Sequence, residues 1–179
     1  MPKWTTHGHG LYVKDKLGAV GENVVIEDGV RIFFPENIEI GNDVYIGHDT
    51  ILKAYFNRKL RIGDGTWIGP QCFIYASGGI HIGRNVGIGP GVKIMSSGHV
   101  TNNLSDPILH RPIEHKLVFL DDGCDIGAGS IILMGAIIGK EAQIGAGAVV
   151  LDNIPDGKTA VGVPAKILYM GRRRVATES

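Results

Sequence analysis

The feature that most constrains this chain is an aliphatic residue that recurs every six positions. The dipeptide Ile-Gly occurs nine times, mostly at steps of six. Extending that phase with four resets marks eighteen positions in six sets of three, and every one is Ile, Leu or Val. They are Val20, Ile26 and Ile32; Ile40, Ile46 and Leu52; Ile62, Ile68 and Ile74; Ile82, Ile88 and Ile94; Leu120, Ile126 and Ile132; and Ile138, Ile144 and Val150.

Except at Leu60, the residue two positions before each large one is small or β-branched, as in Thr66, Cys72 and Ala148. Because a strand alternates its side chains between two faces, both positions point inward. The Gly of each Ile-Gly dipeptide suits a corner between such strands, where a chain turns most easily without a Cβ. Three strand-plus-corner units per turn predict an all-β triangular prism of about six coils. A period of six excludes an amphipathic helix.

Composition excludes several other classes of protein. Eighteen basic residues balance eighteen acidic ones, which argues against nucleic-acid binding by bulk charge. With 44% hydrophobic and 20% charged residues the chain is not disordered, and two cysteines do not make a disulfide scaffold. No apolar stretch is long enough for a signal peptide or a membrane span. We therefore expect a cytoplasmic protein without membrane insertion.

The repeat divides the chain into three parts. We expect a capping segment at 1–19, the repeat domain at 20–152, and a closing segment with a basic tail or short helix at 153–179. Short excesses widen three corners, the largest by four residues between Leu52 and Ile62. Between Ile94 and Leu120 the excess is twenty residues, which predicts a protruding loop at about 97–118. Three of the seven histidines lie there, so we expect the loop to be functional.

Three further segments carry a resemblance to a known family. Ser97-Gly98-His99 enters the loop, Asp125-Ile126-Gly127-Ala128-Gly129 opens the next coil, and Asn153-Ile154-Pro155 precedes a closing Ala160-Val161-Gly162-Val163-Pro164-Ala165-Lys166. With the repeat, these segments resemble the hexapeptide-repeat acetyltransferases, in particular the galactoside and maltose O-acetyltransferase branch. The resemblance implies a left-handed parallel β-helix that forms homotrimers with active sites between subunits.

The resemblance also implies acetyl-CoA as co-substrate and His99 as general base. An imidazole with a pKa near 6.5 can take the proton of an acceptor hydroxyl as it attacks a thioester, and can then protonate the departing thiolate. A carboxylate or a carbonyl should orient the ring. Asp106 and Glu114 are the acidic residues of the loop, and a backbone carbonyl would serve equally well.

Other site residues follow from the same resemblance. Ala128 and Ala146 fall where backbone N–H groups hold the pantetheine arm, Lys166 falls on a basic position near the CoA phosphates, and Arg172 follows close behind. For the acceptor we name Gln71, Asn102, Asn103 and Asp125. No metal is expected. Two departures leave the acceptor open: Gly69 stands where the branch commonly has Asn, and Asp125 stands where it commonly has Trp.

Three alternatives remain at this point. A γ-type carbonic anhydrase shares this prism, and the spacing of His110 and His115 resembles its zinc ligands, with His81 out of frame. A non-catalytic scaffold is a second possibility. Within acyltransferases, an amino sugar can replace the hydroxyl acceptor. We expect a sugar or a nucleotide-linked sugar of surface polysaccharide synthesis as acceptor.

Overall fold

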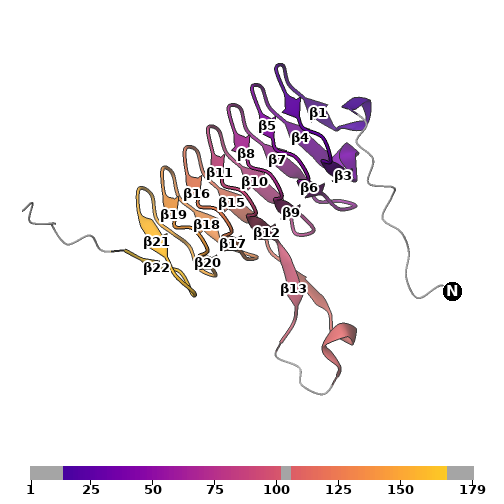
Figure 1. Ribbon diagram of the computed structural model, residues 1–179. Helices are drawn as coiled ribbons and strands as arrows, with labels where there is room; N and C mark the ends of the chain where they lie inside the picture. Colours follow the sequence, from indigo (N-terminus) through magenta and orange to yellow (C-terminus); the bar gives the residue numbers. More distant parts are fainter. Residues whose placement is uncertain (1–13, 102–105, 169–179) are drawn as a thin grey trace, which may run out of the picture.

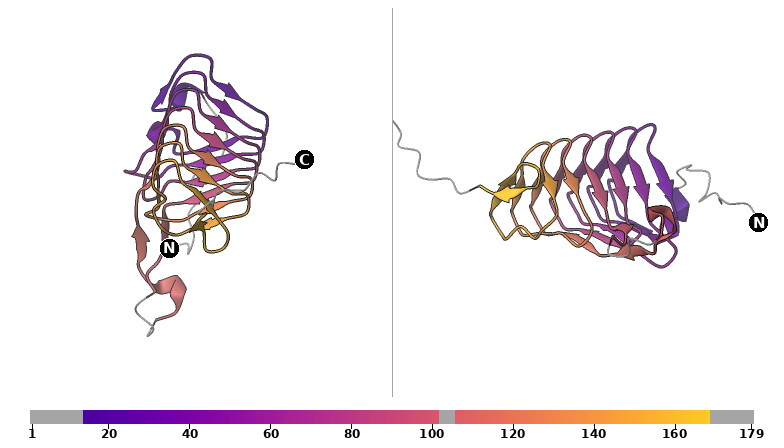
Figure 2. Two further views of the ribbon diagram at one scale, coloured as in Figure 1. Left: turned by 90° about the vertical axis from the view of Figure 1, so that its left-hand side faces the viewer. Right: turned by 90° about the horizontal axis from the view of Figure 1, so that it is seen from below.

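The computed structural model of the protein describes residues 14–101 and 106–168. Three sheets, whose stacked coils pair in parallel, surround a common axis and form a triangular prism. Figure 1 shows this prism from the side, and Figure 2 shows it from two other directions. Each coil contributes one strand to each sheet. A single projection leaves the body of the prism about halfway along it (Figure 1).

The strands are short, with two or three residues each, because every six-residue unit also contains a corner. Sheet A is formed by β1 (Ala19–Val20), β4 (Ile38–Ile40), β7 (Leu60–Ile62), β10 (Ile80–Ile82), β15 (Val118–Leu120) and β18 (Ile137–Ile138). Sheet B is formed by β2 (Val25–Ile26), β5 (Tyr45–Ile46), β8 (Trp67–Ile68), β11 (Gly87–Ile88), β16 (Asp125–Ile126), β19 (Gln143–Ile144), β21 (Thr159–Val161) and β22 (Lys166–Ile167). Sheet C is formed by β3 (Arg31–Phe33), β6 (Ile51–Lys53), β9 (Phe73–Tyr75), β12 (Lys93–Met95), β17 (Ile131–Ile132) and β20 (Val149–Val150).

Six coils are complete, and β21 begins a seventh. We call the three rows of corners the AB, BC and CA edges, after the sheets that each row joins in chain order. Two 3-10 turns lie before β1 and on the CA edge, at Lys14–Lys16 (η1) and Pro35–Asn37 (η2). The sequence predicted this all-β prism, and the coil number agrees with the six predicted sets.

The core is the stack of aliphatic residues that the period predicted. Sixteen of the eighteen large positions are buried; Val20 and Ile26, in the first coil, are only partly covered. From Val30 onwards the small inward slots are buried as well, and Thr50, Thr66 and Ser130 satisfy their hydroxyls on corner carbonyls. Each fully buried Ile or Leu contributes about 1.5–3 kcal/mol, so the coils are held mainly by this stack.

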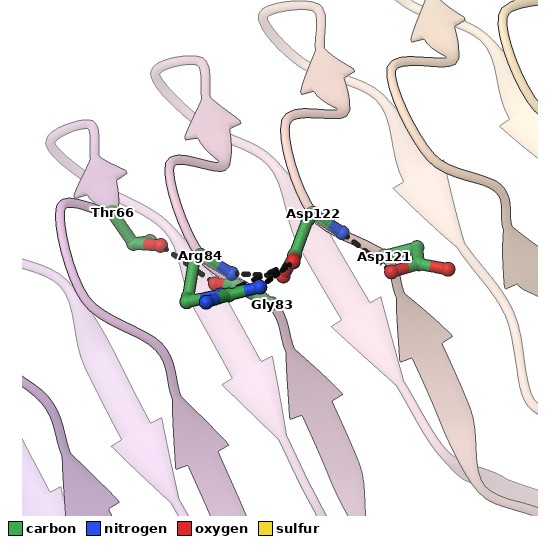
Figure 3. A network of polar contacts seen from close by, with 5 residues as sticks. All are labelled: Thr66, Gly83, Arg84, Asp121 and Asp122. Atoms are coloured by element: carbon green, nitrogen blue, oxygen red, sulfur yellow. Dashed lines mark hydrogen bonds and ion pairs between the residues drawn. The ribbon is translucent and has the colours of Figure 1, made fainter.

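Coil stacking continues without a shift across the long insertion. Ile82 pairs with Leu120 in parallel register, although 38 residues separate them. Figure 3 shows the same continuity on the AB edge. There the carboxylate of Asp122 accepts from the backbone N–H and the guanidinium of Arg84, both at 2.7 Å, while the Thr66 hydroxyl donates to the Gly83 carbonyl at 2.9 Å. The insertion therefore leaves the prism intact on either side.

The insertion itself is a β-hairpin, where the sequence predicted only a loop at about 97–118. β13 (Ser97–His99) and β14 (Ile113–His115) pair antiparallel, and a 3-10 turn, η3, spans Ile108–His110. The hairpin leaves the prism from the CA edge (Figure 1).

The C-terminal segment corrects one expectation. Lys166 and Ile167 form strand β22, antiparallel to β21, so the short helix considered for this part of the tail is wrong for these two residues. An extended return strand closes the last coil because Val161 and Ala160 offer it an open sheet edge. The rest of the tail lies outside the described residues.

Candidate active site

His99 ends strand β13 and lies opposite Ile113 in the hairpin. Its side chain is half-buried, and its Nδ1 lies 3.2 Å from the carbonyl oxygen of Arg111. A carbonyl can only accept, so Nδ1 carries the proton and donates it. The lone pair of the neutral ring is then on Nε2. This is the tautomer that a general base requires.

The orienting partner is thus the backbone carbonyl that the sequence left as one of three choices. Of the two carboxylates, Glu114 forms an ion pair with Lys116 at 3.0 Å. Asp106 accepts a hydrogen bond through its backbone carbonyl from Nε of Arg111, at 2.8 Å. A backbone group leaves no trace in residue identity, so the sequence could not select it.

The base of the hairpin fixes the side on which the His99 ring lies. The hydroxyl of Ser77 donates to that of Ser97 at 2.6 Å. Ser97 and His99 are two residues apart on one strand, so their side chains share a face of the hairpin. Gly98 belongs to the opposite face, where a Cβ would lie 3.6 Å from Cε of Met134. The imidazole therefore lies on the side of the preceding coils.

Ala128 and Ala146 occupy equivalent corners of consecutive coils on the BC edge, where Gly147 donates to the Ala128 carbonyl at 2.9 Å. Both alanines are exposed, and within the described residues neither backbone N–H has a protein partner. The two preceding corners hold Pro70 and Pro90, which have no N–H to offer. These two neighbouring N–H groups can donate hydrogen bonds to successive amide carbonyls of an extended ligand.

Three of the remaining predicted residues lie near this same edge. Gln71 occupies the BC corner of an earlier coil with φ +58, and Asp125 is an exposed residue of β16 just before the Ala128 corner. Lys166 is exposed in β22, close to the end of the prism. At Gly69 a Cβ would lie 2.7 Å from the backbone nitrogen of Pro90, so no side chain fits where the branch commonly has Asn. Asn102, Asn103 and Arg172 lie outside the described residues.

The structure therefore divides the candidate site between two edges of the prism. His99 extends from the CA edge, while Gln71, Ala128 and Ala146 line the BC edge. A sheet separates these edges within one chain. The residues can meet only if the edge of a second copy faces the hairpin, as sites between subunits would require.

Within the described part of one chain, the zinc alternative has no assembled set of ligands. His81 stacks on Phe119 on the outer face of sheet A, with ring centroids 4.6 Å apart. His110 ends η3, whereas His115 lies opposite Ser97. Over residues 14–101 and 106–168 no three His, Cys, Asp or Glu side chains gather as a metal-binding group. The hypothesis of a carbonic anhydrase-like zinc enzyme is therefore not supported.

Neither cysteine is a nucleophile candidate. Cys72 and Cys124 are buried in the small inward slots, as predicted. Burial raises the pKa of both thiols, and with the negative charge of Asp121 nearby it raises that of Cys124 to about 12.

In the described part of the chain there is no helix of the length and hydropathy needed to cross a membrane.

Sequence reasoning missed a hollow of about 390 Å³ on the outer face of sheet A, beside the hairpin base. It lies between the widened corner at 54–59 and the residues that follow β14. Three cations line it on one side and Leu117 and Phe119 on the other. The four-residue excess after Leu52 was the only signal for it.

Comparison with known proteins gives three kinds of match. The family model described as "Hexapeptide repeat of succinyl-transferase" matches residues 59–95 and 120–152. A dTDP-4-amino-4,6-dideoxy-D-glucose acyltransferase of Escherichia coli is 33% identical over 153 residues, which are 83% of this chain and 79% of that protein. A galactoside O-acetyltransferase of Escherichia coli K12 is 28% identical over 166 residues, covering 87% and 65%.

Among solved structures, AntD, an N-acyltransferase from Bacillus cereus in complex with dTDP and 3-hydroxybutyryl-CoA, has a TM-score of 0.77. The identity is 25%, over 90% of this chain and 89% of that one.

Proposed function

The chain belongs to the hexapeptide-repeat acyltransferases, and from this premise we propose that it moves an acetyl group from acetyl-CoA to a hydroxyl or amino group of a sugar or nucleotide-linked sugar. Its coils form the left-handed parallel β-helix of that family, and it is an acyl-CoA-dependent transferase. The acetyl group, the acceptor and the residues that act on them are the proposal.

The observation that carries the mechanism is the hydrogen bond from Nδ1 of His99 to the Arg111 carbonyl. It leaves Nε2 free to remove the acceptor proton as the acceptor oxygen or nitrogen attacks the thioester carbonyl. The same nitrogen then returns the proton to the departing thiolate sulfur. Because the carbonyl already holds the ring in one orientation, no further conformational entropy is lost in positioning His99 for the reaction.

The free N–H groups of Ala128 and Ala146 would hold the amide carbonyls of the pantetheine arm. Lys166, exposed near the end of the prism, would pair with the phosphates, and Arg172 would extend this contact. Gln71, Asn102, Asn103 and Asp125 remain the proposed acceptor contacts.

A homotrimer would complete the site. The division of the proposed site residues between two edges supports a second copy, and the outer face of sheet C supplies apolar area for one. Its outward, half-buried side chains include Phe33, Ile51, Phe73, Met95 and Ile131. An apolar face of this kind is normally covered by a partner. We further propose a cytoplasmic enzyme of surface polysaccharide synthesis.

Transfer to an amino group has support of its own. The relative at 33% identity carries an amino-sugar nucleotide in its name, and AntD is an N-acyltransferase. An amine must lose a proton from its ammonium form before it attacks, and one histidine can accept that proton. A panel of acceptors should therefore contain both alcohols and amines.

The test is release of the CoA thiol from acetyl-CoA with a panel of sugars, amino sugars and nucleotide-linked sugars. His99→Ala should fold and assemble normally but lose at least about a hundredfold in turnover. His110→Ala is the matched control, since this exposed histidine belongs to the same hairpin and should keep full turnover. Near-normal rates for His99→Ala would remove it from the mechanism and favour a scaffold role.

Sharing of the site between copies has a separate test. His99→Ala protein is refolded with an equal amount of an Ala128→Pro/Ala146→Pro double variant. If each site uses His99 of one copy and the BC edge of another, random trimers regain about a quarter of the intact sites. The assay uses acetyl-CoA well below the KM of the double variant, and activity there no higher than that of the two unmixed variants would place the whole site in one chain.

A further inference from the structure

The widened corner at 54–59 forms a ledge on the CA edge, on the side of the hairpin where the His99 ring lies. Its backbone is fixed: Tyr55 and Arg58 form an isolated antiparallel bridge. From the preceding corner, Nδ2 of Asn37 donates to the carbonyls of Tyr55 and Phe56, both at 3.1 Å. The ledge is therefore rigid enough to present its side chains in one arrangement.

The ledge supplies the positive side of the 390 Å³ hollow. Arg58, Lys59 and Arg61 line it, and no carboxylate belongs to its lining among the described residues. Lys59 and Arg61 share the carboxylate of Glu39, whereas Arg58 has no ion pair within the described part of the chain. On this side three cations face one carboxylate, that of Glu39, so it is positive and suited to an anion. Asp121 and Asp122 are near enough to His81 to raise its pKa, but neither lines the hollow.

The opposite side of the hollow is apolar and aromatic. The side chains of Phe119 and His81 stack with an angle of 13° between their rings, and Leu117 is 53% exposed at the rim. Leu117 and Phe119 thus place apolar surface next to the cations of the ledge side. It suits a flat ring attached to an anionic group.

The hollow also connects to the catalytic side of the hairpin. Gly78 and Gly79 belong to its lining and directly follow Ser77, whose hydroxyl bonds Ser97. From Ser97 to His99 the strand advances about 7 Å at about 3.3 Å per residue. A ligand that fills the hollow can thus extend a sugar-sized group towards Nε2 of His99.

We propose that this hollow binds the nucleoside diphosphate part of the acceptor, so that the acceptor is a nucleotide-linked sugar rather than a free sugar. Arg58, with Lys59 and Arg61, holds the diphosphate. The base lies against Leu117 and Phe119, and the sugar extends to the hairpin. The statement that the sugar extends to the hairpin rests on the proposed transferase function. Nucleotide binding itself is independent of acyl transfer.

Calorimetric titration with UDP and with dTDP as probes tests the binding without any turnover. Both the unmodified protein and the control Lys140→Ala, which removes an exposed cation from the AB edge, should bind at least one probe. Arg58→Ala and Leu117→Ser should each weaken that binding by about tenfold or more. Unchanged affinity in Arg58→Ala, or no binding of either nucleotide to the unmodified protein, would overturn the proposal.

Two further outcomes separate this inference from its alternatives. If saturating CoA displaces the nucleotide probe, the hollow belongs to the co-substrate and the acceptor assignment falls. If acetyl transfer proceeds to free sugars while neither nucleotide binds, the hollow assignment fails and the transferase function stands. Nucleotide binding that depends on Arg58 in a protein without acyl transfer would uphold the hollow and overturn the proposed function.

Discussion

Ser77, in a corner of the prism, donates a hydrogen bond of 2.6 Å to Ser97, the first residue of the hairpin. Ser77 is buried, while Ser97 is half-buried at the point where the chain leaves the coil. The neighbouring Ser96 hydroxyl accepts from the N–H of Gly78 at 2.8 Å. These two contacts anchor the hairpin to the preceding coil and set the direction of the strand that carries His99.

Removing this anchor should disturb His99 without touching it. In Ser97→Ala we expect kcat to fall about five- to tenfold, because a base displaced by a fraction of an ångström is poorly aligned. The KM for acetyl-CoA should not change, since the BC edge is intact. Ser97→Thr keeps the hydroxyl and should restore kcat. Steady-state kinetics on folded, assembled protein distinguish this positioning effect from a simple loss of stability, and an unaltered kcat in Ser97→Ala would refute it.

Replacing Ala128 by proline should weaken acetyl-CoA binding specifically. Pro70 and Pro90 already occupy the equivalent corners and follow Gly69 and Gly89, just as Ala128 follows Gly127, so the backbone tolerates the change. The substitution removes one N–H, and a lost hydrogen bond of about 0.5–1.5 kcal/mol raises the KM for acetyl-CoA up to about tenfold. Ala128→Ser retains the N–H and should behave like the unmodified protein. Equal KM values for the two variants would show that this amide is not used.

Stability should decrease on mild acidification because of His81. Burial lowers the pKa of His81 below its ordinary value of 6.5, and the charge of Arg61 lowers it further, against the weaker opposing effect of Asp121 and Asp122. His81 therefore binds a proton more readily in the unfolded chain than in the folded chain, and the free energy of unfolding falls as the pH drops below about 7.

His81→Phe preserves a ring against Phe119 but cannot titrate, so it should lose less stability over the same interval. Urea unfolding between about pH 7 and pH 5, at a fixed protein concentration, measures the difference between the two proteins. If both curves decline in parallel, His81 does not contribute.

Both thiols should be inert in the folded protein. With Cys124 at a pKa of about 12 and Cys72 also raised by burial, almost no thiolate exists at pH 8. A chromogenic disulfide reagent should therefore react with neither cysteine until denaturant is added, and then with both. Lys140→Cys places a thiol at an exposed corner of the AB edge and serves as the positive control. Rapid reaction of a native cysteine would contradict the burial described here.

The prism was predictable because one rule repeats along the chain. A large aliphatic residue every six positions determined sheet, coil and core together, and only Val20 and Ile26 at the open first coil are not fully buried. The phase also implies that Ala128 and the start of the hairpin fall on different edges. That separation could have been read from the sequence before any coordinates.

The parts that depend on the hairpin could not be predicted in the same way. Its antiparallel pairing sets Ser97 against His115, outside the repeat, and the orientation of His99 depends on a carbonyl that any residue at position 111 would supply. The hollow joins Arg58 to Leu117, which are far apart in sequence and meet only because of coil stacking. Local patterns contain no information about such contacts.

The unshifted pairing of Ile82 with Leu120 means that the stacking of the coils does not depend on the hairpin inserted between them. Mutations can lengthen, shorten or replace the excursion between these coils without requiring any compensating change in the stack beneath it. Evolution can thus change the hairpin, and with it the choice of acceptor, while the stack of coils stays the same. The hairpin can likewise be exchanged between related enzymes without redesign of the coils.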